Sequence, residues 1–186
     1  TEGYILTLSK SDPNLFIICR EKLLGIGNAH KTGIEWGISK GFLLIGTMDG
    51  DGLHLPKDMF KVLDAIVDNP VVVGDRFGEL IDNRSLFRRF LTYSLRVLIR
   101  GILGIRFDAS NGLRGYNFNL LEYDLILNVQ ADNYDFFIES AYNLVKNKIP
   151  VKEVPVTLQN RIFGESKMTL KQAIRTLNTI LQITKR

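Results

Sequence analysis

The stretch at residues 41–58 constrains the fold of this chain more than any other. An apolar run at residues 42–45 shows no alternation, which predicts a strand covered on both faces. The run is followed by Asp49-Gly50-Asp51, and Pro56 then opens a predicted helix. Two carboxylates this close repel each other unless a cation lies between them, and hard oxygen ligands suit Mg²⁺ or Mn²⁺. The pattern therefore predicts a metal site at the carboxyl end of a parallel strand, with a solvated acidic turn as the alternative.

Strands and helices alternate along the remainder of the chain. Strands are predicted at residues 15–19, 71–73 and 151–157, and a glycine-containing turn with a short strand at 108–116. Helices are predicted at residues 1–11, 25–39, 56–67, 84–104, 119–127, 136–146 and 169–186. No repeat or linker interrupts this alternation. We therefore expect one α/β domain over residues 1–186, with a mostly parallel sheet, flanking helices and the strand at 151–157 at an edge.

The composition is that of an ordinary globular domain, with 45% hydrophobic and 24% charged residues and a net charge of +4. The basic residues form no recognition motif and are not interleaved with aromatics, so we expect no nucleic-acid partner. No run of 18 apolar residues predicts a membrane-spanning helix. The only cysteine, Cys19, lies in an apolar run and is expected to be a buried thiol, compatible with a reducing compartment. Trp36, the only tryptophan, is expected to pack in the core.

Two predicted helices are amphipathic and basic. In the helix at about 84–104, Arg89, Arg96 and Arg100 share one face, with Thr92 beside them. The opposite, apolar face consists of Phe87, Leu91, Leu98 and Ile102. The terminal helix, about 169–186, has an apolar face of Leu170, Ala173, Ile174, Leu177 and Leu181. Both helices suit an anionic membrane surface, and packing on the sheet is the alternative.

Six motifs occur in an order that resembles a known family. They are Gly25 to Lys31 with Gly33, Asp49-Gly50-Asp51 with Pro56 and Asp58, Gly74-Asp75-Arg76-Phe77, Asp108-Ala-Ser-Asn-Gly-Leu-Arg114, Glu153-Val-Pro-Val156 and Arg161-Ile-Phe-Gly-Glu-Ser-Lys167. Together they resemble the polyprenyl-phosphate glycosyltransferases of the GT-A fold, family two, a group that includes dolichol-phosphate mannose synthases. The resemblance implies inverting transfer of a sugar from a GDP- or UDP-sugar to a polyprenyl (dolichyl or undecaprenyl) phosphate. Each motif alone is not specific.

The resemblance also implies the residues that bind the donor. Asp49 and Asp51 are implied to hold Mg²⁺ or Mn²⁺ against the donor diphosphate, with Asp51 and Arg161 as catalytic residues. Gly27, Lys31, Ser166 and Lys167 are implied to bind the donor. Many relatives have a glutamine ligand where this chain has Leu53, which cannot ligate. Water or His54 would then substitute, unless His54 is a surface or capping residue.

The acceptor in this family is already an anion and needs no general base. It needs cations that hold its phosphate, and guanidinium groups suit phosphate well. The resemblance implies that Arg76, Arg88 or Arg89, Thr92 and Arg114 bind the acceptor phosphate. A solvated face is the alternative for Arg96 and Arg100. Gly112 is expected to serve the backbone geometry of its turn.

The chain differs from the family at its front. Family members begin with a βαβ unit and an acidic turn that bind the nucleotide, and residues 1–10 correspond to the helix after that turn. We therefore expect an N-terminally truncated GT-A fold. The basic amphipathic helices lead us to expect a peripheral location at the cytoplasmic face of a membrane. A catalytic fragment is one interpretation. A non-catalytic scaffold protein that retains the fold is the alternative.

Overall fold

The computed structural model describes residues 2–76, 86–157 and 178–184, and within helix α4 it describes the side chains of 93, 94 and 96–103. The helices are α1 (Glu2–Ser9), α2 (Ile26–Ser39), α3 (Pro56–Ala65), α4 (Leu86–Leu103), α5 (Asp124–Leu127) and α6 (Asp135–Lys146). The strands are β1 (Leu44–Thr47), β2 (Val71–Asp75), β3 (Arg114–Asn117) and β4 (Val151–Pro155). Residues 178–183 are also helical. The alternation of strands and helices predicted from the sequence is therefore confirmed for most of the described chain.

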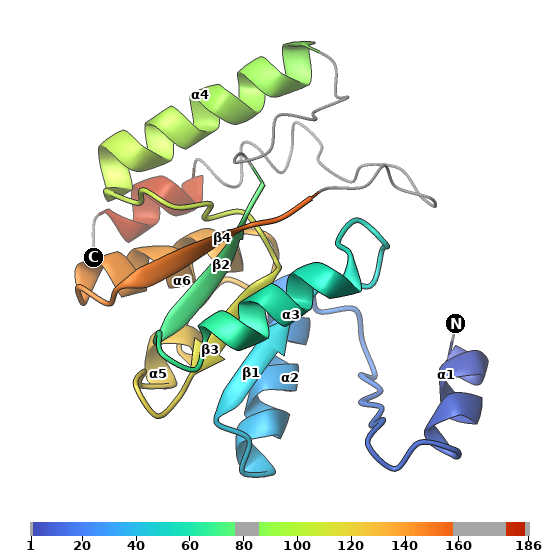
Figure 1. Cartoon of the computed structure of the whole chain (residues 1–186). Helices are drawn as coiled ribbons and strands as arrows, with labels where there is room; N and C mark the ends of the chain where they lie inside the picture. The colour runs from blue at the N-terminus through green and yellow to red at the C-terminus, as the bar shows by residue number, and fades with distance from the viewer. Residues whose placement is uncertain (1, 77–85, 158–177, 185–186) are drawn as a thin grey trace.

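The four strands form one mixed sheet in the order β1-β3-β2-β4 (Figure 1). Strand β3 runs antiparallel to both of its neighbours, whereas β2 and β4 are parallel. The expectation of a mostly parallel sheet is therefore wrong for the described strands. The antiparallel strand is β3. Its four residues, Arg-Gly-Tyr-Asn, carry no pattern from which the direction of the strand could be predicted. Strand β4 lies at an edge, as Pro155 predicts.

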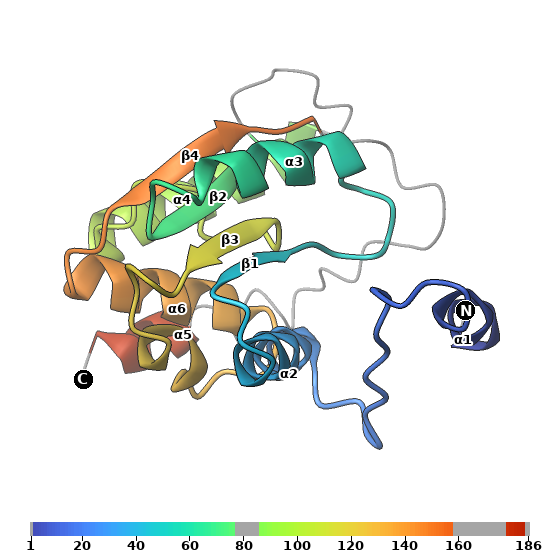
Figure 2. The ribbon, with the colours of Figure 1, turned by 60° about the horizontal axis from the view of Figure 1, so that its bottom comes forward.

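Helix α3 lies on one face of the sheet, and α2, α5 and α6 lie on the other (Figure 2). Glycines in the sheet let α3 approach closely. A Cβ atom at Gly115 would lie 2.2 Å from Cγ2 of Ile66, and one at Gly46 would lie 2.7 Å from Sδ of Met59. The other face is filled by a core that includes Ile34, Val71, Val73, Tyr116, Ile126, Phe136, Phe137 and Leu144. The sheet is therefore the middle of three layers.

Helix α4 packs through one side of its C-terminal half. Ile99 and Leu103 are buried against Ile138 and Ala141 of α6 and against Ile180 and Ile183 of the terminal helix. Leu98 and Ile102, of the predicted apolar face, are exposed, as is Leu181 of the terminal helix. Residues 158–177 lie outside the described residues, with most of the predicted terminal helix. No helix in the described part of the chain has the length and apolar character needed to cross a membrane.

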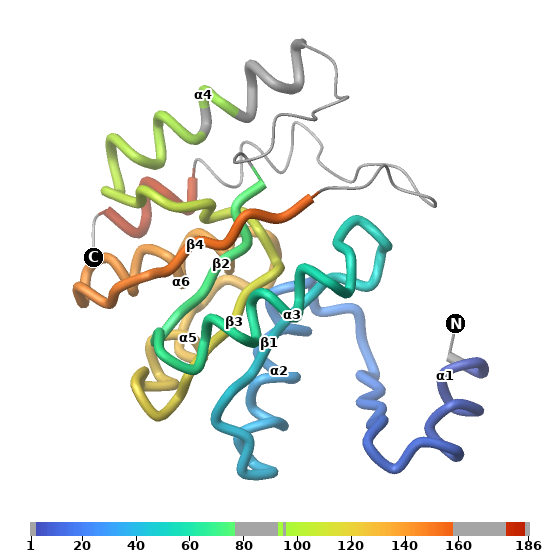
Figure 3. The backbone as a smooth tube through the Cα atoms, viewed as in Figure 1, coloured from blue at the N-terminus to red at the C-terminus, as the bar shows by residue number. Residues whose placement is uncertain are grey.

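The N-terminal segment lies beside the layered body. Figure 3 traces α1 and the irregular chain that joins it to α2. The predicted strand at residues 15–19 is wrong: none is formed there, Cys19 is exposed and Phe16 retains 56% of its accessible surface. Phe16 packs on Trp36, 4.9 Å between ring centroids, so Trp36 lies in a surface aromatic cluster and not in the core. Leu44, the first residue of the edge strand β1, is also exposed.

Candidate functional site

Four segments meet at one edge of the sheet. Strands β1, β2 and β4 all end there, and β3 begins there, because its antiparallel direction brings its first residue to the same edge. Three features therefore lie together at this edge: the acidic turn after β1, Arg76 after β2 and the turn at residues 108–113 before β3. Ligands of open α/β sheets bind at this position.

The acidic turn after β1 is held against the turn before β3. The Thr47 hydroxyl donates a hydrogen bond to the carbonyl of Gly112 over 3.0 Å. The Asp49 carboxylate lies so close to Gly112 that a Cβ there would be 3.0 Å from Oδ1 and 3.1 Å from Oδ2. Glycine at position 112 therefore permits this close approach of the Asp49 carboxylate to the backbone, and its φ angle is not positive. The Asp51 carboxylate accepts a hydrogen bond from the Leu53 N–H over 3.0 Å, which fixes the next bend.

The donor set of the acidic turn fits a divalent cation only in part. Among the described residues, no group of three or more His, Cys, Asp or Glu side chains is arranged to hold a metal. Mg²⁺ is commonly bound through one or two carboxylates together with water and substrate phosphates. Asp49 and Asp51 therefore fit a cation whose remaining ligands come from a bound diphosphate and from water. They do not form a metal cage of protein atoms.

His54 lies inside this site and not on the surface or in a cap. Its side chain is buried, and its Nδ1 atom makes no hydrogen bond in the described part of the chain. Burial lowers the pKa of His54, and the nearby positive charge of Arg76 adds to this effect. A neutral imidazole is therefore favoured at this position.

Arg76 is held by a bidentate ion pair. Its Nε and Nη2 atoms donate to the Asp108 carboxylate over 2.7 and 2.9 Å, and Nη2 also donates to the Ser110 hydroxyl over 2.6 Å. Burial alone raises the pKa of Asp108, but Arg76 and Ser110 bring it below its usual value. The N–H of Asp108 donates to Glu153, whose pKa is raised by burial. Arg76 is thus oriented by its neighbours and retains 19% side-chain exposure.

Arg114, predicted to bind the acceptor phosphate, has a structural role. Its side chain is fully buried and donates to the carbonyls of Ala109, Asn111 and Phe137 and to the Ser140 hydroxyl, over 2.7–3.0 Å. The guanidinium carbon also lies 5.0 Å from the centroid of the Phe137 ring. Because these contacts use the donors internally and bury the charge, the acceptor-binding prediction for Arg114 is wrong.

The predicted donor-binding residues of α2 pack against the chain at residues 129–136. A Cβ at Gly27 would lie 2.4 Å from Cβ of Phe136, so glycine is needed there for close packing, and a donor contact of its backbone stays a prediction. Lys31 donates to the carbonyl of Val129 over 3.1 Å and pairs with Asp132 at 2.8 Å. A donor contact of Lys31 would have to replace this pair and stays a prediction.

The remaining predicted site residues belong to α4 and to the segment at residues 161–167. The side chains of Arg88, Arg89 and Thr92 on α4, and the whole of Arg161, Ser166 and Lys167, lie outside the described residues. Their roles stay predictions.

One site residue was missed. Nε2 of His30, on α2, lies 3.6 Å from Oδ1 of Asp49. No local signal links the two residues, since they are far apart in the chain and meet only through packing.

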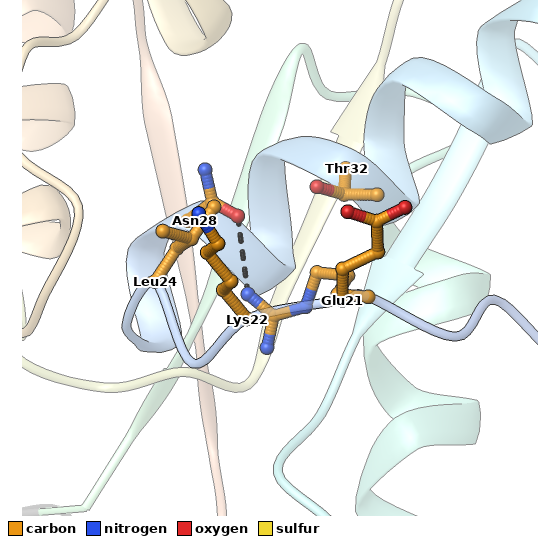
Figure 4. A pocket seen from close by; sticks show the side chains of 6 residues that line it. Glu21, Lys22, Leu24, Asn28 and Thr32 are labelled. Carbon is orange, nitrogen blue, oxygen red and sulfur yellow. Dashed lines mark hydrogen bonds between the residues drawn. The ribbon is translucent and has the colours of Figure 1, made fainter.

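A separate depression lies at the start of α2 (Figure 4). It has a volume of about 410 Å³ and is lined by Arg20, Glu21, Lys22, Leu24, Asn28 and Thr32. Nη1 of Arg20 donates to Oδ1 of Asn28 over 3.1 Å on its wall. None of the lining residues belongs to the sheet edge described above.

Comparison with known proteins decides the family. Residues 1–124 match the family model described as glycosyl transferase family 2. The chain belongs to glycosyl transferase family 2. Membership and the layered α/β structure confirm the predicted GT-A fold class, apart from the mixed sheet.

Curated relatives of this family 2 chain include enzymes named for polyprenyl phosphates. The chain is 30% identical to a polyprenol monophosphomannose synthase of Mycolicibacterium smegmatis, over 87% of this chain and 63% of that protein. It is 27% identical to an undecaprenyl-phosphate mannosyltransferase of Micrococcus luteus, over 88% and 68%. It is also 27% identical to a dolichol-phosphate mannosyltransferase of Saccharomyces cerevisiae, over 91% and 64%. The chain thus spans about two thirds of the length of these relatives.

Proposed function

We propose that this chain carries the catalytic centre of an inverting glycosyltransferase that moves a sugar from a GDP- or UDP-sugar to a polyprenyl phosphate. The relatives' names support this acceptor class, and the predicted motifs support the donor class. The observation that carries the proposal is the shared sheet edge. There the acidic turn and the oriented guanidinium of Arg76 both contact the turn at residues 108–113.

The two sides of this edge suit two different phosphates. Asp49 and Asp51 would hold Mg²⁺ or Mn²⁺ against the donor diphosphate, and a bound cation would neutralise the charge that develops on the leaving nucleotide. Arg76 offers a guanidinium to the acceptor phosphate, which is already an anion. Its pair with Asp108 orients the guanidinium, so less conformational entropy is lost on binding. Arg161, Ser166, Lys167, Arg88, Arg89 and Thr92 are proposed to complete the two phosphate sites.

A lipid acceptor requires access to a membrane, and α4 offers a surface for it. Tyr93 and Val97 are exposed apolar residues on the same side of this helix as the exposed Arg100, and Leu98 and Ile102 are exposed on the opposite side. Exposed apolar side chains beside a basic residue suit the surface of an anionic bilayer. We propose that α4 places the chain at the cytoplasmic face of a membrane.

Transfer of radiolabelled sugar to a polyprenyl phosphate tests the reaction. With Mn²⁺ present, Asp51→Asn is expected to lower the rate by at least about 100-fold, because an amide neither neutralises nor binds the cation well. The control is Asp64→Asn, an exposed acid on α3 outside the site. Equal rates for Asp51→Asn and the unaltered chain would refute the role of the acidic turn. No transfer by any of the three proteins would favour the non-catalytic scaffold.

Flotation with anionic liposomes tests the membrane surface. The double variant Tyr93→Ser with Ile102→Ser is expected to lose retention at low salt, because it removes exposed apolar area from α4. Phe60→Ser with Leu63→Ser is the matched control, since these exposed apolar residues lie on α3. Equal retention of both double variants would exclude α4 as the contact.

A further inference from the structure

We propose that His30 is a positioning residue that holds the Asp49 carboxylate in the orientation needed to bind a divalent cation. The inference rests on the proposed function, because His30 has this role only if Asp49 binds a divalent cation. It concerns a residue of α2 that has no place in the motif at the acidic turn.

The environment of His30 fixes the direction of its ring. The side chain retains 8% of its accessible surface and lies against two aromatic rings of α6. Its ring centroid is 5.0 Å from that of Phe137, edge to face, and 5.9 Å from that of Phe136. The closely packed wall leaves the imidazole little room to rotate. The ring is therefore held with Nε2 on the side of Asp49.

The polar contacts of His30 are few. Nδ1 makes no hydrogen bond within the described residues, and Nε2 lies 3.6 Å from Oδ1 of Asp49. This separation is longer than a normal hydrogen bond, which spans about 2.7–3.2 Å. A buried imidazole usually has polar partners, because burying a polar group without one is costly. The approach to Asp49 is therefore the feature of this position that packing alone does not explain.

The Asp49 carboxylate is confined from a second direction by the turn before β3. A Cβ at Gly112 would lie 3.2 Å from Cγ of Asp49, so the carboxylate rests against the backbone there. His30 and Gly112 belong to different elements and approach the same group. Side chains behind a metal ligand commonly orient it, and removing them typically costs about 10–100-fold in metal affinity.

Two substitutions separate positioning from packing. His30→Phe keeps a ring against Phe136 and Phe137 but removes Nε2. His30→Gln keeps an amide that reaches a similar position but removes the ring. If His30 only packs, His30→Phe retains metal affinity and His30→Gln loses stability. If His30 positions Asp49, His30→Phe loses affinity while its melting temperature is maintained or raised, because a buried polar atom without a partner is removed.

The experiment measures Mn²⁺ binding by calorimetry at constant pH in the presence of GDP, together with thermal unfolding. We expect His30→Phe to weaken Mn²⁺ binding by about 10-fold or more and His30→Gln to stay within about threefold of the unaltered chain. Unaltered affinity in His30→Phe would overturn the inference. If His30→Phe does not fold, His30→Met is measured in its place. A Mn²⁺ affinity of His30→Met equal to that of His30→Gln would overturn the inference.

Asp49→Ala distinguishes this inference from the proposed function. If Asp49→Ala binds Mn²⁺ as tightly as the unaltered chain, the metal role of the acidic turn fails, and the role of His30 fails with it. If Asp49→Ala loses binding while His30→Phe retains it, only the role of His30 fails. Loss of binding in Asp49→Ala and in His30→Phe, with recovery in His30→Gln, supports both.

Discussion

Replacing Asp108 by asparagine tests whether the buried ion pair holds Arg76 in place. The substitution keeps the shape of the side chain but removes the negative charge that faces Nε and Nη2 of Arg76. The Asp108 side chain is 1% exposed and that of Arg76 is 19% exposed. Removing one partner of a buried pair typically costs about 3–5 kcal/mol, because the other charge is left uncompensated. We expect the lower end, about 3 kcal/mol, since Arg76 keeps some contact with solvent and with Ser110.

Urea unfolding monitored by circular dichroism measures this cost. Natural domains have about 5–15 kcal/mol of stability, so a loss of about 3 kcal/mol lowers the urea midpoint clearly. For a chain of this size about 2–4 °C accompanies each kcal/mol, so the melting temperature should fall by about 6–12 °C. Asp64→Asn, an exposed acid on α3, is expected to change stability by less than about 0.5 kcal/mol. A loss below about 1 kcal/mol for Asp108→Asn would refute the reasoning.

Three further predictions concern particular contacts. Gly27→Ala should destabilise the fold by about 1–3 kcal/mol, because its Cβ would meet Cβ of Phe136 at 2.4 Å. Gly33→Ala in the same helix, with nothing within 4 Å, should gain about 0.5–1 kcal/mol; equal urea midpoints for the two variants would contradict this reading. Gly112→Ala should displace the Asp49 carboxylate and weaken Mn²⁺ binding measured by calorimetry, whereas Gly50→Ala, which meets nothing within 4 Å, should not; the opposite order would show that the approach is unimportant. Burial raises the pKa of Glu153 above its ordinary value of 4.5, so the stability it contributes is complete below pH 4.5 and is lost as pH rises through the folded-state pKa. Glu153→Gln should therefore match or exceed the unaltered chain in urea midpoint at pH 7, and a lower midpoint there would refute the burial argument.

Features specified by neighbouring residues were predictable from the sequence. Helix α3 begins at Pro56 as predicted, because proline at the first helical position is a local signal. Strand β2 was recognised from its apolar run and is buried as expected. The acidic turn follows β1 at the sheet edge, as the order of strand, turn and helix predicts. The family was recognised from several motifs together, and the match over residues 1–124 confirms it.

Features that depend on distant packing were not predictable. An apolar run such as residues 15–19 becomes a strand only if another strand pairs with it, and none does among the described residues. Arg114 resembled a phosphate ligand because the sequence does not reveal that the carbonyls of residues 109, 111 and 137 converge on it. His30 was missed for the same reason, since α2 and the turn after β1 approach only in the folded chain.

The central position of β3 determines the distance between the two halves of the site. Arg114 lies opposite Thr47 of β1 and Val73 of β2, so the start of this strand is fixed on both sides. The turn directly before it contacts Asp49 through Gly112 and Arg76 through Asp108. The distance between Asp49 and Arg76 therefore depends on strand register and not on the movement of a loop. A ligand that contacts both residues must fit this fixed distance.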